Sequence, residues 1–118
     1  MCYYRSMSVV LIQNRLTKEQ FEKAKKDYFT YIKITIDINK KLVAVGGEYH
    51  ADAEKVILEN DGDQQNVWGG GVNLETGEFE TNAVINIKPG VNPSLDILNP
   101  EVREAFLSIV KESLKEYV

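Results

Sequence analysis

The sequence predicts one α+β domain, in which an antiparallel sheet of about five strands is combined with three helices as a ferredoxin-like variant. Three observations support this fold class. The length of 118 residues suits one hydrophobic core. Residues 31–38 and 79–87 alternate between apolar and polar side chains, as half-buried strands do. Segments with helical spacing of apolar residues separate the strands, which gives the order β-α-β-β-α-β-β-α.

The N-terminal part is expected to form a strand and a helix. Residues 7–13 contain a short run of aliphatic side chains, which is typical of a strand buried on both sides. Thr17 and Gln20 have the spacing of a capping box, in which each side chain bonds to the backbone N–H of the other residue. This spacing predicts a helix over about 17–28.

The central part is expected to form a hairpin of residues 31–38 and 42–46. A two-residue turn between these strands places Ile36 opposite Val43, and this register puts the apolar side chains of both strands on one face. A stripe of apolar residues then predicts a helix over 50–59.

The C-terminal part is expected to form a second hairpin and a last helix. Strands are predicted at 67–74 and 79–87, with a turn at 75–78. Prolines and a glycine make residues 88–98 irregular. The dipeptide Asn99-Pro100 then has the residue types that favour an N-cap and a first helical position.

One face of the sheet is expected to be polar, because we expect the helices to cover only the apolar face. Asn82 and Asn86 lie on this polar face, where their amides are candidates for binding a ligand. The simpler alternative is that both amides are solvated. The whole polar set consists of Lys33, Thr35, Asp37, Glu80, Asn82 and Asn86.

Composition and charge argue against several classes of protein. Fourteen Lys and Arg against eighteen Asp and Glu give a net charge of −4, which disfavours nucleic acid as a partner. No apolar run reaches the roughly 20 residues that span a bilayer, so we expect no membrane partner. The single cysteine, Cys2, cannot form an internal disulfide, which suits the reducing cytoplasm. Residues 1–6 are expected to be a disordered extension of a domain that spans 7–118.

Segment 46–54, GGEYHADAE, is the strongest candidate for chemistry. It holds the only histidine, and Glu48, His50 and Asp52 are candidates for general acid–base catalysis. His50 and Glu54 are four residues apart on one helix face and are candidate ligands of a divalent metal, although no second histidine exists. A helix N-terminus disfavours imidazolium, so we expect a neutral His50. The alternative is an exposed histidine beside carboxylates that only stabilise the helix, with no cofactor.

Segment 68–71 is the second candidate. Trp68 is followed by three glycines, and Gly69 and Gly70 would let a ligand or another backbone approach closely. The Lys-Ser/Thr pair of a phosphate-binding loop does not follow, so this is not such a loop. The alternative is a bulged or sharply twisted strand.

Segments 46–54 and 68–71 make the chain resemble a family of short prokaryotic proteins known as a domain of unknown function. The resemblance extends from about Met7 to the C-terminus and includes residues 12–17 and 82–86. It implies a stand-alone cytosolic protein of bacteria or archaea, and it assigns no catalytic residues.

Two kinds of function fit these observations. We expect a small binding or interaction domain that self-associates, with a homodimer favoured, because copies of a chain commonly cover exposed sheet edges and apolar stripes. The alternative is a hydrolase-like or metal-dependent enzyme, in which Glu48, His50 and Trp68 line one pocket for a small-molecule ligand.

Overall fold

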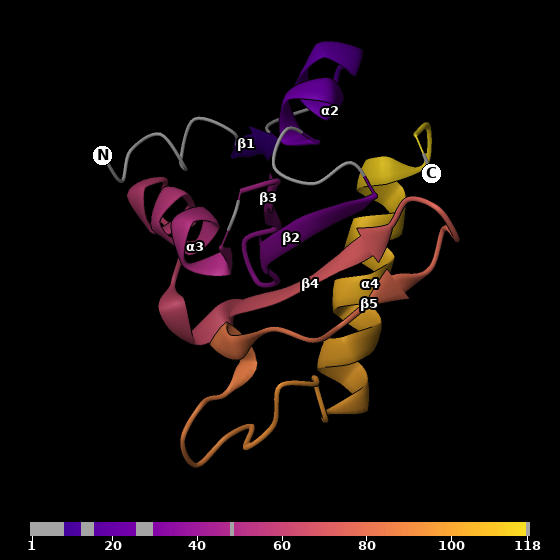
Figure 1. Ribbon diagram of the computed structural model, residues 1–118. Coiled ribbons are helices and arrows are strands. Elements are labelled where there is room, and N and C mark those ends of the chain that lie inside the picture. Colours follow the sequence, from indigo (N-terminus) through magenta and orange to yellow (C-terminus); the bar gives the residue numbers. More distant parts are fainter. Residues whose placement is uncertain (1–8, 13–15, 26–29, 48, 118) are drawn as a thin grey trace.

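The computed structural model describes residues 9–12, 16–25, 30–47 and 49–117, which form a five-stranded antiparallel sheet and three α-helices (Figure 1). The predicted fold class and element order are confirmed. None of the helices formed by the described residues is long and apolar enough to cross a membrane. The elements are β1 (Val10–Ile12), α2 (Lys18–Ala24), β2 (Tyr31–Asp37), β3 (Leu42–Val45), α3 (His50–Glu59), η1 (Gln64–Asn66), β4 (Val67–Asn73), β5 (Phe79–Glu80), η2 (Val84–Asn86) and α4 (Pro100–Leu114).

The strands lie in the order β1-β3-β2-β4-β5, and every neighbouring pair is antiparallel. β3 therefore lies between β1 and β2, as in a split βαβ unit, and β4 and β5 extend the sheet beyond β2. The predicted hairpin register is confirmed, because Ile36 pairs with Val43. Asp37 Oδ1 closes the turn by accepting bonds from the backbone N–H groups of Asn39 and Lys40, both at 2.9 Å.

The predicted helix starts are also confirmed. Thr17 Oγ1 accepts a bond from the Gln20 N–H at 3.1 Å, and Gln20 Oε1 accepts one from the Thr17 N–H at 3.0 Å. Asn99 Oδ1 caps α4 by accepting a bond from the Glu101 N–H at 2.9 Å. The predicted end of α2 near residue 28, the predicted strand start at residue 7 and the extension 1–6 lie outside the described residues.

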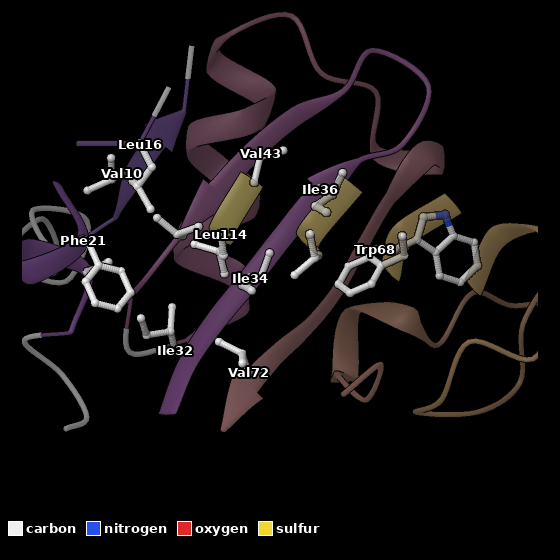
Figure 2. Packing of buried hydrophobic residues seen from close by; sticks show 14 of the residues in the cluster. Val10, Leu16, Phe21, Ile32, Ile34, Ile36, Val43, Trp68, Val72 and Leu114 are labelled. Carbon is white, nitrogen blue, oxygen red and sulfur yellow. The ribbon is translucent and has the colours of Figure 1, made fainter. Parts of the chain in front are cut away.

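The main core lies between the sheet and helices α2 and α4. β2 contributes Ile32, Ile34 and Ile36, and α4 contributes Phe106 and Leu114, all of them almost completely buried. The close view shows Ile32, Ile34 and Ile36 along β2, with Phe21 towards one end of the cluster and Trp68 towards the other (Figure 2).

The expectation of a solvated polar face is wrong. Helix α3 covers that face and packs Ala53 and Ile57 against Ala44 and Val67 in a second, smaller core. The neighbouring strands present Ala44 and glycines on this face, so a helix can approach the sheet closely. As a result, two members of the predicted polar set on β2, Thr35 and Asp37, are completely buried.

The predicted strand 79–87 is wrong beyond Glu80. The chain leaves the sheet there and forms η2, and it carries Asn86 back to the edge of β4. Asn86 Oδ1 accepts a bond from the Gly69 N–H at 2.8 Å, and Asn86 Nδ2 donates to the Gly69 carbonyl at 2.9 Å. A side-chain amide thus bonds both backbone groups that a strand residue would have paired.

Candidate functional site

The structure brings the two segments that the sequence suggested as one pocket into contact at His50, but it places Trp68 on the opposite face of the sheet. His50 is the first residue of α3 and lies on the α3 face of the sheet, against Gly69 and Gly70. Trp68 belongs to the buried cluster on the α4 face and is only 4% exposed. Glu48, the third member of the predicted pocket, lies outside the described residues.

His50 is half-buried and has a defined tautomer. Its Nε2 lies 2.7 Å from the carbonyl oxygen of Gly70, and a carbonyl only accepts, so Nε2 carries the hydrogen. Burial lowers the pKa of His50, the backbone bond to Gly70 opposes this shift, and the positive charge of Lys33 adds to it. The imidazole is therefore neutral near pH 7, as predicted, but burial is the main cause.

The three glycines of β4 make room for side chains of this chain. A Cβ atom on Gly69 would lie 2.8 Å from both His50 Cδ2 and Ala83 Cβ, and one on Gly71 would clash with the ring of Tyr31. The glycines sit in a regular strand covered by packed side chains, so the space above them is occupied. Burial, together with the nearby Glu80 carboxylate, raises the pKa of Tyr31 to about 12.

The remaining predicted site residues have different surroundings. Asp52 Oδ2 is buried and has no hydrogen-bond partner among the described residues. Glu54 is half-buried beside a cleft, whereas Asn82 is exposed and pairs through its backbone with Asp96. Within the described part of the chain, no three His, Cys, Asp or Glu residues are grouped to hold a metal ion. His50 and Glu54 therefore have no third ligand among these residues.

Asn86 fixes the loop formed by residues 81–98, which we call the 81–98 loop. Besides its contacts with Gly69, its Nδ2 lies 3.0 Å from the carbonyl oxygen of Thr81 and 2.9 Å from that of Leu95, so its two N–H groups are shared among three carbonyl oxygens. The side chain is completely buried, so these bonds replace bonds to water. Asn86 thus joins both ends of the loop to the sheet.

Asn92 holds the middle of the same loop. Its Nδ2 lies within 2.8–3.0 Å of the carbonyl oxygens of Asn86, Ser94 and Asp96, and its Oδ1 accepts a bond from the Leu98 N–H at 3.0 Å. Only 2% of this residue is exposed. Two buried asparagines therefore give an irregular segment a fixed shape.

The 81–98 loop exposes large apolar side chains to solvent, although hydrogen bonds from Asn86 and Asn92 fix its backbone. Figure 1 shows this loop extending from the body of the domain below β4 and β5. We call the exposed set the apolar loop surface. It consists of Val84 (74% exposed), Ile87 (48%), Val91 (72%), Leu95 (49%) and Leu98 (55%).

The two charged side chains of the loop have partners within the domain. Asp96 accepts bonds from the Thr81 hydroxyl and from the Ile97 N–H, and it pairs with Arg103 at 3.1 Å. The Thr81 bond is the main cause of the lowered pKa of Asp96. Lys88 Nζ lies 4.9 Å from the centre of the Trp68 ring.

A cleft of about 660 Å³ lies beside this loop and is lined by residues of the loop, of α3 and of η1. Its lining differs from one wall to the other, with charged and amide side chains on α3 and η1 and mostly apolar side chains on the loop. The lining residues are Glu54, Gln64, Gln65, Asn66, Ile85, Ile87, Lys88, Pro89 and Val91.

Another hollow, of about 430 Å³, lies between β1 and the C-terminal end of α4. Its lining includes Ile12, Ser113 and Tyr117, and it holds none of the residues that the sequence suggested for a site. The cleft beside the 81–98 loop holds one of them, Glu54.

Sequence reasoning missed Lys88 and Asn92. Lys88 precedes a Pro-Gly turn, and such a position signals a loop without indicating what the side chain reaches. Asn92-Pro93 likewise signals a turn. Recognising the buried role of Asn92 required knowing which carbonyl groups the loop leaves without partners.

A family model described as a protein of unknown function (DUF5674) matches residues 10–113. No curated protein and no solved structure matches the chain.

Proposed function

Since the chain belongs to this family, whose function is unknown, we propose from its own geometry that it is a small interaction domain that forms a homodimer through the apolar loop surface. The observation that carries the proposal is the contrast within one loop. The backbone is fixed by two buried asparagines, while five large apolar side chains point into solvent. Exposed apolar patches on rigid loops are typical of binding surfaces.

The charges of the loop favour a second copy as the occupant. A dimer with twofold symmetry brings the same surface together twice, so any unpaired charge on it would meet a like charge. The apolar loop surface contains no charged residue, and the loop has only two charged side chains. Asp96 is paired with Arg103, and Lys88, which has no ion-pair partner among the described residues, lines the neighbouring cleft. An apolar and nearly neutral surface is therefore complementary to its own copy, even though the chain as a whole has a net charge of −4.

The exposed apolar area of the loop sets the expected affinity of the dimer. Full burial of a Val, Leu or Ile side chain contributes about 1.5–3 kcal/mol. These side chains are 48% to 74% exposed. Two copies that covered them would gain about 9–18 kcal/mol, against an association cost of about 4–15 kcal/mol, so the midpoints of the two ranges leave a net gain of only about 4 kcal/mol. We therefore expect a weak dimer, with a Kd in roughly the micromolar to millimolar range.

Sedimentation velocity over a concentration series up to about 1 mM tests the proposal. We expect the wild-type sedimentation coefficient to rise with concentration, whereas Val84→Glu and Val91→Glu should remain monomeric. Both residues are more than 70% exposed, so the monomer should tolerate the change. Leu58→Glu replaces an exposed apolar residue of α3, outside the loop, by the same charged residue, so it is the control and should dimerise like the wild type.

A wild-type protein that stays monomeric throughout this series would contradict the proposal. So would Val84→Glu and Val91→Glu variants that dimerise as strongly as Leu58→Glu, because the dimer would then use another surface.

A further inference from the structure

The cleft beside the 81–98 loop has two opposite charges that form no ion pair with each other. Lys88 and Glu54 both line it, and their charges influence one another. No described residue forms an ion pair with either of them. A ligand could therefore place an anionic group on Lys88 and a cationic group on Glu54.

Lys88 is held in place by contacts that leave part of its ammonium group available. Its Nζ lies 4.9 Å from the centre of the Trp68 ring and donates to the Gln64 carbonyl at 3.2 Å. An ammonium group has three N–H donors, so a donor remains for a ligand. Lys88 is half-buried, and this burial lowers the pKa of its ammonium group, whereas the Glu54 carboxylate opposes the shift. A partly desolvated cation binds an anion more strongly than a fully solvated one.

The rest of the lining matches a small molecule with a branched apolar part. Ile85, Ile87 and Val91 contribute aliphatic groups to the lining, and Gln64 and Gln65 contribute polar groups. The volume of about 660 Å³ lies within the range of small-molecule sites, which is roughly 300–1,000 Å³.

We propose that this cleft binds a free α-amino acid with an aliphatic side chain, its carboxylate on Lys88, its ammonium group on Glu54 and its side chain against Ile85, Ile87 and Val91. An α-amino acid carries both charges on adjacent carbons beside its side chain, and the lining offers a complement to each of the three groups. A simple carboxylate or a simple amine would satisfy only one charge and leave the other unused.

Isothermal titration calorimetry with L-leucine tests this site. The analogues are 4-methylpentanoate, which lacks the amino group, 3-methylbutan-1-amine, which lacks the carboxylate, and glycine, which lacks the side chain. We expect leucine to bind and each of the two singly charged analogues to bind about 10- to 100-fold more weakly, since each loses a charge-assisted hydrogen bond. Glycine should also bind more weakly, because it leaves the aliphatic groups of the lining uncovered.

Variants identify the two charges. Lys88→Met keeps the aliphatic stem and Glu54→Gln keeps the shape, and each should weaken leucine binding by about 10- to 100-fold. Lys55→Met and Glu59→Gln make the same replacements at exposed positions of α3 outside the cleft, so they should bind leucine like the wild type. Circular dichroism and thermal unfolding of all four variants identify any that fails to fold, and Glu54→Gln still tests the site if Lys88→Met does.

Three results would overturn the proposal. The first is no heat of binding for leucine at concentrations up to about 10 mM. The second is equal binding of leucine to Lys88→Met, Glu54→Gln and the two controls. The third is binding of the singly charged analogues as strong as that of leucine. Because the titration is carried out at a concentration where sedimentation shows monomers, its outcome is independent of whether the chain dimerises.

Discussion

Replacing Asn86 by alanine should remove the side chain that holds the 81–98 loop to the sheet. The carboxamide is completely buried and bonds to the N–H and carbonyl of Gly69 at 2.8 and 2.9 Å and to the carbonyls of Thr81 and Leu95 at 3.0 and 2.9 Å. Each buried polar group left without a partner costs about 1–3 kcal/mol. Water will enter the space and satisfy some of these groups, so we expect a loss of about 3–5 kcal/mol in the free energy of unfolding.

Urea unfolding followed by circular dichroism measures this loss directly. Asn82→Ala is the matched control, because Asn82 is exposed and its side chain makes no hydrogen bond with the described residues. It should change the free energy of unfolding by less than about 0.5 kcal/mol. The same loss for both variants, or a loss below about 1 kcal/mol for Asn86→Ala, would show that the amide does not stabilise the loop.

Two further predictions concern β4 and the histidine beside it. Gly70→Ala should destabilise the domain by about 2–4 kcal/mol in the same urea assay, because its Cβ would clash with the Glu80 carbonyl and lie 2.9 Å from the Phe106 ring. Gly77→Ala is the control and should cost only about 1 kcal/mol, because a Cβ there meets no atom within 4 Å and only the φ of +76° is unfavourable. Equal losses for the two variants would argue against close packing around Gly70. Because the pKa of His50 is lower in the folded than in the unfolded chain, the unfolded chain binds a proton first as the pH falls through about 6.5. His50 therefore stabilises the fold above that pH, and this contribution is lost below it. Urea midpoints of His50→Gln should therefore depend less on pH than those of the wild type between about pH 7 and 5, and an unchanged dependence would contradict the burial of His50.

Much of the fold could be predicted because its signals are local. The capping box of Thr17 and Gln20 and the N-cap at Asn99 depend only on residues a few positions apart, and both occur as predicted. The register of Ile36 with Val43 follows from a short turn and from the need to place apolar side chains on one face.

The errors arose where distant residues decide the structure. The sequence placed Thr35 and Asp37 on a sheet face without a covering helix, but α3 covers this face and both residues are buried. A polar residue in a strand does not reveal which helix will pack over it. The alternation over 79–87 indicated a strand, but Asn86 takes the place of a strand partner at Gly69, and this bond links residues 17 apart. The alternation of apolar and polar residues indicated a strand, but the hydrogen bonds that the buried backbone groups of β4 require decided the structure there.

The candidate site was predicted only in part for the same reason. His50 was identified because it is the only histidine of the chain, and its neutrality is supported by the structure. Its supposed neighbour Trp68 points to the other side of the sheet, a consequence of the two-residue period of strands. Lys88 reaches the cleft from a loop, where the sequence does not show the direction of a side chain.

The most direct test of the account is a dilution series of the ¹⁵N-labelled protein followed by amide chemical shifts. We propose that the fixed 81–98 loop places its apolar side chains against those of a second copy. On dilution from about 1 mM to about 10 μM, we expect shifts to change for amides at and around Val84, Val91 and Leu95 and to stay constant in β1 and α2. Shifts that do not change anywhere, or that change only at the β1 edge or along α4, would contradict this proposal.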